Sequence, residues 1–217
     1  MTHELPGTPP DLSMFTESFW DERYSSSQRI WSGNPNQRLV EQVADLRPGS
    51  ALEVGCGEGA DVVWLAAQGW RATGLDVSGV ALARAEAHAA EAGVAGATSW
   101  LRADLVGGDA VPGTFDLVCA AFLHAPHDVF DRLYATVAAA VAPGGTLFVV
   151  AHHPADVTSG LRQAALAHLL FTPERLLSTL DLDDWDVVVA EGQEREQAGP
   201  DGDLVTVTDT VLRAVRR

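Results

Sequence analysis

Positive charge is scarce in this sequence. Its 217 residues include 14 arginines and no lysine, against 30 aspartates and glutamates, so the formal net charge is -16. An acidic surface repels phosphate backbones and anionic lipid headgroups, and no run of arginines indicates a local basic groove. We therefore expect neither nucleic acid nor a membrane as a partner. The absence of lysine fits a GC-rich coding sequence, and we attach no chemistry to it.

Cysteine is almost absent as well. Cys56 and Cys119 have neither the spacing of a metal site nor that of a disulfide framework, so we expect both to be reduced thiols. No H-E-x-x-H motif or paired Cys/His spacing occurs, and the acidic run at 181–186 is typical of a solvated loop. We expect no metal site.

Long apolar runs are missing too. None approaches the roughly 20 residues that span a bilayer, and the first residues lack the basic and apolar regions of a signal peptide. These absences predict a cytoplasmic protein. Its length fits one domain with a short leading segment, which we divide as 1–36 and 37–217, and the apolar fraction of 47% is enough for a sizeable core.

Apolar segments of strand length alternate with segments of helical periodicity, which predicts βαβ units. The expected strands are Ala51–Val54, Arg71–Asp76, Thr98–Ala103, Phe115–Phe122 and Thr146–His152. The expected helices are Arg38–Leu46, Ala60–Gln68 with Val63, Leu65 and Ala66 facing inward, 78–92 capped by Ser78, Val129–Val141, and a helical region over Leu161–Leu180. Residues 15–35 are too irregular for a core element, and Pro143, Gly144 and Gly145 form a turn.

Two further strand-like runs, Trp185–Glu191 and Leu204–Val215, are joined by a short loop at 198–202 that is typical of a hairpin. A short loop joins only antiparallel strands. The predicted fold is therefore α/β: a Rossmann-like, doubly wound, mostly parallel sheet with a terminal antiparallel hairpin.

The glycine-rich segment Gly55–Gly59 leaves a predicted strand and opens a predicted helix. Glycines in this context permit positive φ and let a ligand approach the main chain, and the helix N-terminus adds free N–H groups. The third glycine comes one residue earlier than in the dinucleotide pattern, and the acid Glu53 precedes the first. A purely structural tight turn remains the alternative interpretation.

Two acids follow at the carboxyl ends of the next predicted strands. Asp76 has the spacing of an acid that accepts hydrogen bonds from ribose hydroxyls, and a carboxylate there disfavours a ribose phosphate. A carboxylate at Asp104 is able to accept a hydrogen bond from an exocyclic amine such as that of adenine. Because open α/β sheets bind ligands at this edge, glycines and acids together predict a nucleoside site.

These residues resemble the class I S-adenosylmethionine-dependent methyltransferases. The resemblance rests on LEVGCGEG at 52–59, GLDVS at 74–78, RADL at 102–105, FDLVCAAFLH at 115–124 and PGGTLFVV at 143–150. It implies that S-adenosyl-L-methionine is the cofactor and that Glu53 braces the glycine loop. The residues it implies in cofactor binding are Gly55, Cys56 and Gly57 through the main chain, Asp76 with Val77 at the ribose, Asp104 with Leu105 at the adenine, and Ala120 on the methionine side.

The motifs FWDERY at 19–24 and WSGNPN at 31–36 are similar to the opening of the thiopurine and tellurite-resistance group of small-molecule methyltransferases. The similarity implies that residues 1–36 form a lid or cap, that Arg23 pairs with the cofactor carboxylate and that Trp31 packs over the methionine arm. An arginine suits a carboxylate, and an indole face attracts a sulfonium. The alternative is that the tryptophans only attach a loose segment to the sheet.

A methyltransferase of this kind needs a base only for some acceptors. A thiol is partly ionised near neutral pH, whereas a phenol or hydroxyl needs help with its proton. His124, His152 and His153 follow the fourth and fifth predicted strands and are the catalytic candidates, although lining the pocket or bonding a loop is the commoner role of such residues. We expect a small-molecule acceptor, with a thiol or other soft nucleophile slightly preferred over a phenol or amine.

Other functions remain open at this point. A nucleic-acid or protein methyltransferase would use the same fold, but the residues at 120–124 lack the Asn/Asp-Pro-Pro-aromatic motif of DNA amino-methylases. A catalytically silent cofactor-binding module is a further alternative, and a nicotinamide dehydrogenase is disfavoured by the glycine spacing. The sequence leaves monomer and homodimer equally open.

Overall fold

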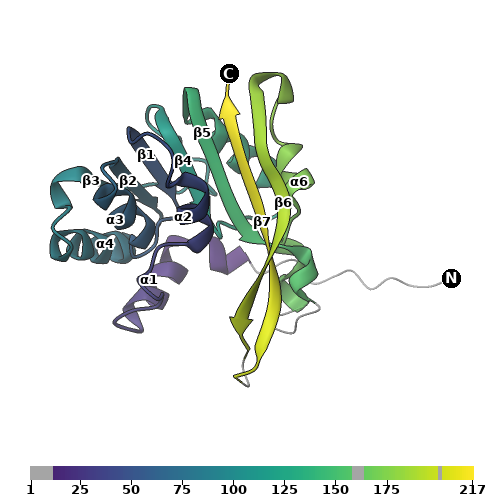
Figure 1. Ribbon diagram of the computed structural model, residues 1–217. Helices are drawn as coiled ribbons and strands as arrows, with labels where there is room; N and C mark the ends of the chain where they lie inside the picture. Colours follow the sequence, from purple (N-terminus) through teal and green to yellow (C-terminus); the bar gives the residue numbers. More distant parts are fainter. Residues whose placement is uncertain (1–11, 158–163, 200–201) are drawn as a thin grey trace.

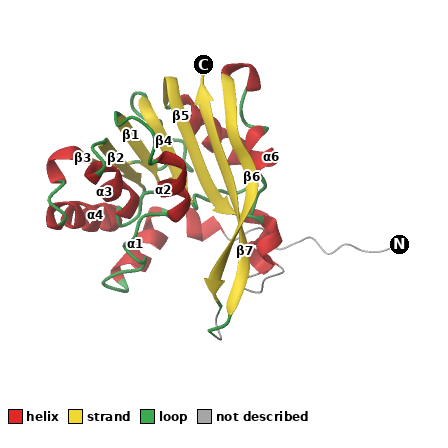
Figure 2. Cartoon of the chain, viewed as in Figure 1, coloured by secondary structure: helices red, strands yellow, loops and turns green. Residues whose placement is uncertain are grey.

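A computed structural model describes residues 12–157, 164–199 and 202–217, and in it seven strands form one sheet (Figures 1 and 2). The five strands expected first along the sequence correspond to β1, β2, β3, β4 and β5. A long hairpin, β6 and β7, follows them. The bounds are Ser50–Val54 (β1), Arg71–Asp76 (β2), Thr98–Arg102 (β3), Phe115–Ala121 (β4), Val141–His152 (β5), Trp185–Ala198 (β6) and Leu204–Arg216 (β7).

The strand order is β3-β2-β1-β4-β5-β7-β6, with β1 to β5 parallel and β7 antiparallel to both of its neighbours. This confirms the predicted fold class. The order reverses between β1 and β4, and a doubly wound sheet opens a crevice at the carboxyl ends of its strands at such a point. Pairing of β5 with β7 stops at His152, while β6 and β7 continue pairing beyond it, so the hairpin projects past this same edge (Figure 1).

Helices cover both faces of the sheet. They are α1 (Glu17–Ser25), α2 (Gln37–Val43), α3 (Ala60–Ala67), α4 (Gly79–Glu91), α5 (Phe130–Ala139) and α6 (Pro173–Leu177), with short 3-10 turns at Leu12–Phe15, Ala95–Ala97, Pro154–Val157, Ala164–Leu169 and Leu182–Asp184. In β1, Ala51 packs in a core cluster with α2 and α3, whereas Leu52 and Val54 pack in a second cluster with α5. Because successive side chains of a strand face opposite ways, a sheet covered on both faces needs apolar residues throughout, as β1 has.

Most predicted helix boundaries agree with the structure to within one or two residues. The Ser78 hydroxyl accepts the Ala81 N–H at 3.0 Å and so caps α4, as predicted. In α3 the buried residues are Val62, Leu65 and Ala66. The expectation that Val63 faces inward was wrong by one position, because Val62, Leu65 and Ala66 have the i, i+3, i+4 spacing of one helix face and Val63 lies beside that face.

Residues 15–35 are more ordered than their composition indicates. α1 occupies Glu17–Ser25, and its N-cap is Thr16, whose hydroxyl accepts the Phe19 N–H at 3.3 Å. This helix was not predicted from the sequence, although the segment is not a core element, as expected. This helix has no apolar stripe, and of its side chains only Tyr24 is buried. It is held by individual contacts, which a periodicity argument does not detect.

Two other predictions need correction. The turn predicted at Pro143–Gly145 lies inside β5, as an irregularity in which the register with β4 shifts between Phe115 and Leu117. The helical region predicted over Leu161–Leu180 is broken into a 3-10 turn and the short α6. Its residues 161–163 lie outside the described part of the chain, as do residues 200–201 of the predicted hairpin loop.

Candidate active site

The glycine loop between β1 and α3 bends sharply over the end of β2. Gly55, Gly57 and Gly59 have φ angles of 72°, 51° and 81°, in the left-handed region that side chains other than glycine rarely adopt. The N–H groups of Gly55 and Cys56 donate to the Leu75 carbonyl at 2.8 and 3.0 Å. This anchors the loop beside the carboxyl end of β2, where the predicted ribose-binding acid is located.

The Asp76 carboxylate lies against this loop. One oxygen accepts the Gly57 N–H at 2.8 Å, and the other accepts the Ser78 N–H at 2.9 Å. The side chain is 8% exposed, and burial raises its pKa, opposed by the N–H groups of Ser78, Gly57 and Val77. Each carboxylate oxygen has two lone pairs, so Asp76 retains acceptor capacity beyond these main-chain donors. It braces the loop and still has sites for a ligand.

Two aromatic side chains of the N-terminal segment cover Gly57. A Cβ atom at Gly57 would lie 2.8 Å from the Tyr24 hydroxyl oxygen and 3.4 Å from Trp31 Nε1. Trp31 Nε1 donates to the Tyr24 hydroxyl at 3.1 Å, and burial raises the pKa of Tyr24, which keeps the hydroxyl protonated. The Arg23 guanidinium lies 5.8 Å from the rings of both Trp20 and Trp31. Of the predicted lid residues, Trp31 is thus next to the glycine loop, and Arg23 lies against Trp31.

Acidic side chains that the sequence analysis did not single out fasten this segment to the domain. Glu58 accepts the N–H groups of Ile30 and Trp31, both at 3.1 Å, and pairs with Arg84 at 2.9 Å. Asp61 accepts the Asn36 N–H at 2.6 Å. On α1, Asp21 accepts the Ser78 hydroxyl at 2.5 Å and the Val80 N–H at 3.3 Å. Glu58 belongs to the glycine motif and could be read from the sequence, but its hydrogen-bond partners could not be predicted.

The acid that precedes the glycines occupies a different environment. Glu53 is 2% exposed, and its carboxyl lies against Cys119 and the main chain of Ala121. Burial, with the nearby Asp61 carboxylate, raises the pKa of Glu53 well above its usual range, and burial raises that of Asp61 to about 6. Glu53 is therefore enclosed between β1, β4 and the start of α3.

The residues predicted at the adenine and methionine positions lie at the ends of β3 and β4. The Asp104 carboxylate is half-buried and accepts the Gly107 N–H at 2.7 Å, which shapes the loop after β3. Leu105 is buried in the core, and its carbonyl accepts a hydrogen bond from Arg132. Ala120 is fully buried within β4. Of these three, only Asp104 has a polar side chain at the crevice edge.

The chain after β4 turns through a strained residue. Phe122 has φ of 55° and is the only non-glycine residue with positive φ in the described ranges. Such strain persists where the surrounding structure enforces it, and it is common at functional sites. The turn places Leu123 over Gly55, with Leu123 Cδ1 3.1 Å from where a Cβ would stand. The residues after β4 therefore border the glycine loop.

Two of the three candidate histidines are together and one is apart. The rings of His124 and His152 stack with centroids 5.3 Å apart, and His152 also packs on Phe122 at 4.3 Å. His124 Nδ1 lies 3.1 Å from the Leu169 carbonyl, which assigns the Nδ1 proton to this bond and makes Nε2 an acceptor in the neutral ring. His153 Nδ1 accepts the Ala155 N–H, and its ring faces Gly192 on β6, so it stands outside this pair.

The described ranges contain no group of three or more His, Cys, Asp or Glu side chains arranged to hold a metal ion. No helix in these ranges combines the length and apolar character that crossing a bilayer requires.

Residues 51–145 match a family described as "Methyltransferase domain". This stretch begins at β1 and contains the glycine loop, Asp76, Asp104 and β4. Fold, site and family match agree on one class: residues 51–145 match this methyltransferase family, and the fold is similar to those of solved S-adenosylmethionine-dependent methyltransferases. The fold is similar to that of a solved structure, TehB from Haemophilus influenzae, with a TM-score of 0.69 at 15% identity over 93% of this chain and 67% of that chain.

Sequence relatives carry names with different acceptors. The chain is 33% identical over 151 residues to a ubiquinone biosynthesis O-methyltransferase of Burkholderia multivorans, covering 68% of this chain and 63% of that protein. It is 32% identical over 117 residues to ribosomal RNA small subunit methyltransferase C of Alcanivorax borkumensis, covering 49% of this chain and 33% of that protein. The chain thus spans less than two thirds of the length of these relatives.

The residues present fit the cofactor of this class. A Cβ at Gly55 or Gly57 would intrude on the space beneath Leu123 and Tyr24, so glycine at these two positions lets a ligand approach the main chain closely. A buried carboxylate with spare acceptor capacity stands beside them at Asp76, where ribose hydroxyls would donate. Aromatic faces, including the half-exposed Trp31, suit a sulfonium.

Proposed function

We propose that this chain transfers a methyl group from S-adenosylmethionine to a small-molecule acceptor, with a thiol or other soft nucleophile preferred. The observation that carries the proposal is the contact of the Asp76 carboxylate with the Gly57 N–H at 2.8 Å, beneath the aromatic cover of Tyr24 and Trp31. It joins a nucleoside-binding acid, an open main chain and a water-excluding lid at one edge of the sheet.

In this proposal each element holds one part of the cofactor. Asp76 accepts the ribose hydroxyls, Asp104 accepts from the adenine amine, and Arg23 pairs with the carboxylate of the methionine arm. The bound cofactor supplies a methyl group on a sulfonium: the acceptor lone pair forms the new bond to carbon, and the carbon–sulfur electron pair stays on sulfur. The chain contributes orientation and exclusion of water by residues 12–36, both of which lower the barrier.

Acceptor classes differ in whether the protein must remove a proton from the acceptor. A thiol loses its proton to water before the reaction, so it needs no base from the protein. An oxygen acceptor is the second candidate, because His124 Nε2 is an acceptor in the neutral ring and the stacked His152 lies beside it. In that case Nε2 takes the hydroxyl proton as the oxygen attacks. Relatives named O-methyltransferase are consistent with this second candidate.

Binding and turnover measurements test the proposal directly. S-adenosylhomocysteine is expected to bind in calorimetry and to raise the melting temperature, whereas NAD does neither. Transfer of a labelled methyl group is then measured with thiols, phenols, amines, ribosomal RNA and protein, and turnover is expected with a small molecule, fastest with a thiol. Turnover on RNA or protein alone would overturn the small-molecule assignment, and binding without any turnover would leave only a cofactor-binding module.

The role of Arg23 is tested by Arg23→Ala. Loss of a charge-assisted hydrogen bond at an exposed position is expected to raise the KM for S-adenosylmethionine about tenfold and to leave the acceptor KM within about twofold. Arg29→Ala is the matched control, because Arg29 belongs to the same segment but packs on Gly33. A larger effect on the acceptor KM than on the cofactor KM would instead assign Arg23 to the acceptor pocket.

A further inference from the structure

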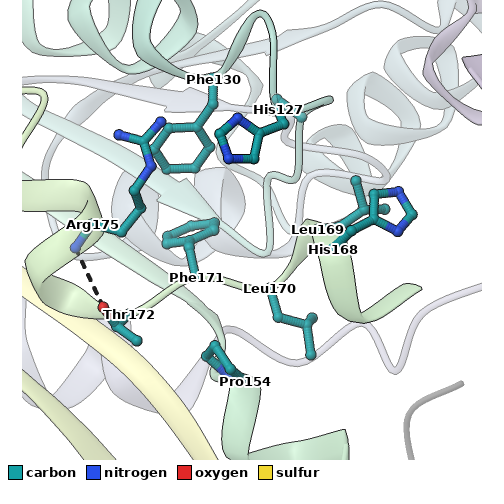
Figure 3. Close-up of a pocket in the computed structure, with 10 residues that line it drawn as sticks. His127, Phe130, Pro154, His168, Leu169, Leu170, Phe171, Thr172 and Arg175 are labelled. Atoms are coloured by element: carbon teal, nitrogen blue, oxygen red, sulfur yellow. Dashed lines mark hydrogen bonds between the residues drawn. The ribbon is translucent and has the colours of Figure 1, made fainter. Parts of the chain in front are cut away.

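A cavity of about 260 Å³ lies at the carboxyl edge of the sheet, on the side of α5 (Figure 3). Its walls come from the loop after β4, the start of α5, the residue after His153 and the segment that leads into α6. The residues that form its aromatic and charged lining are His127, Phe130, His168, Phe171 and Arg175. None of the residues assigned above to the cofactor contributes to it.

The charge of the lining is opposite to that of the chain. Arg175 is a fixed cation, the imidazoles of His127 and His168 add hydrogen-bond donors, and none of the ten described lining residues is acidic. The whole chain carries a net charge of -16. A concavity on such a protein whose lining includes an arginine and no acidic residue favours an anionic ligand over a neutral one.

The geometry of Arg175 suits a carboxylate beside an aromatic ring. Its guanidinium carbon is 4.4 Å from the centroid of the Phe130 ring, which holds the group in place, and the ring of Phe171 meets that of Phe130 edge-on at 4.9 Å (Figure 3). Only Nη1 is engaged, by Asp131 at 2.6 Å and Ser178 at 3.1 Å. Nε and Nη2 have no hydrogen-bond partner among the described residues, and together they form the fork that binds a carboxylate through two oxygens.

The cavity adjoins the histidine pair. His124 Nδ1 bonds the carbonyl of Leu169, a lining residue, and the rings of His124 and Phe171 have centroids 6.1 Å apart. On its other side, His124 follows Leu123, which covers Gly55 of the cofactor loop. His124 and Leu123 therefore lie between the cavity and the glycine loop.

We propose that this cavity is the acceptor subsite and that it binds a small aromatic carboxylate, with Arg175 holding the carboxylate and Phe130 and Phe171 packing on the ring. The assignment to an acceptor rests on the proposed methyltransferase function, whereas the anion site itself does not. The methyl-accepting atom then lies at the opposite end of the ring from the carboxylate, toward His124.

Benzoate and its neutral analogue benzamide are the probes, with affinities measured by ligand-observed NMR on the full chain. Benzoate is expected to bind at least tenfold more tightly than benzamide, and Arg175→Met to remove this preference while benzamide binding stays unchanged. Arg175→Lys, which keeps the charge but not the fork, is expected to be intermediate. Asp131→Asn is expected to tighten benzoate binding, because it removes the competing carboxylate.

Arg217→Met is the matched control, because Arg217 also forms a surface pair with an aspartate, Asp186, at 2.7 Å. It is expected to leave benzoate binding unchanged. Equal affinities for benzoate and benzamide, or an Arg175→Met variant that melts like the wild type and keeps the preference, would overturn the anion site. Specific benzoate binding without S-adenosylhomocysteine binding would instead overturn the methyltransferase proposal and leave the anion site standing.

The step from anion site to acceptor subsite has its own test. A pair of aromatic thiols, 4-mercaptobenzoate and its methyl ester, is compared as acceptors. The acid is expected to have a KM at least tenfold below that of the ester in the wild type, and Arg175→Met to equalise the two. Benzoate that binds at Arg175 but fails to compete with 4-mercaptobenzoate would show that the cavity is not the acceptor subsite.

Discussion

Asp76→Ala is expected to weaken S-adenosylhomocysteine binding about a hundredfold, the largest loss among single side-chain truncations in the site. Ribose hydroxyls donating to a buried carboxylate form charge-assisted hydrogen bonds of roughly 1.5–3 kcal/mol each, and about 2.7 kcal/mol corresponds to a hundredfold. Isothermal calorimetry measures this affinity. Because Asp76 also accepts the N–H groups of Gly57 and Ser78, the variant is expected to melt at a lower temperature as well.

Asp116→Ala is the control that separates the loss of a main-chain hydrogen bond from the loss of ligand contacts. Asp116 likewise accepts a main-chain N–H, that of Ser50 at 2.7 Å, but it lies at the start of β4, at the opposite edge of the sheet. This control is expected to lose stability without losing affinity for S-adenosylhomocysteine. If Asp76→Ala bound the ligand as tightly as the wild type, Asp76 would be only a brace for the glycine loop, and the proposed site would lose its central residue.

Gly57→Ala is expected to reduce S-adenosylhomocysteine binding about ten- to hundredfold. The new methyl group would stand 2.8 Å from the Tyr24 hydroxyl, so either the aromatic cover or the glycine loop must move, and overpacking of this kind costs roughly 1–3 kcal/mol. The φ angle of 51° adds strain of about 1–2 kcal/mol, which is expected to lower the melting temperature. Calorimetry and thermal unfolding report the two effects separately.

Gly93→Ala isolates the effect of strain alone. Gly93 has φ of 73° at the end of α4, and a Cβ there meets nothing within 4 Å. It is expected to lose a similar amount of stability and to bind S-adenosylhomocysteine like the wild type. A second variant, Gly57→Ala with Tyr24→Phe, is expected to regain part of the lost affinity. Wild-type affinity in Gly57→Ala itself would contradict a cofactor approach along this loop.

Much of the fold was predictable because both faces of the sheet are covered. This produces apolar runs such as 117–120, and glycines such as Gly69 and Gly93 mark the ends of helices. The irregularity in β5 was missed because a Pro-Gly-Gly sequence is equally typical of a free turn. α1 was missed because its contacts are polar and long-range: Asp21 with α4, and the covering of Gly57 by Tyr24.

Some residues of the candidate site were likewise predictable from the sequence, and others were not. Gly55, Gly57 and Asp76 were identified from spacing, because strand ends in a parallel sheet converge at one edge. The three histidines were equivalent in the sequence, yet the structure stacks His124 on His152 and directs His153 toward β6. Arg175 and its cavity had no signal, since Phe130, Phe171 and Arg175 come from separate segments that meet only after folding.

The amino-acid sequence by itself determined the order of strands and helices, the glycine bend and the acid that follows it, because these depend on local conformation and short spacing. Only the tertiary structure decided which side chains share a space: the aromatic cover on Gly57, its fastening by Glu58 and Asp61, and the cationic cavity around Arg175. Contacts between residues far apart in the chain depend on how the elements pack against each other, and local sequence patterns carry no record of that packing.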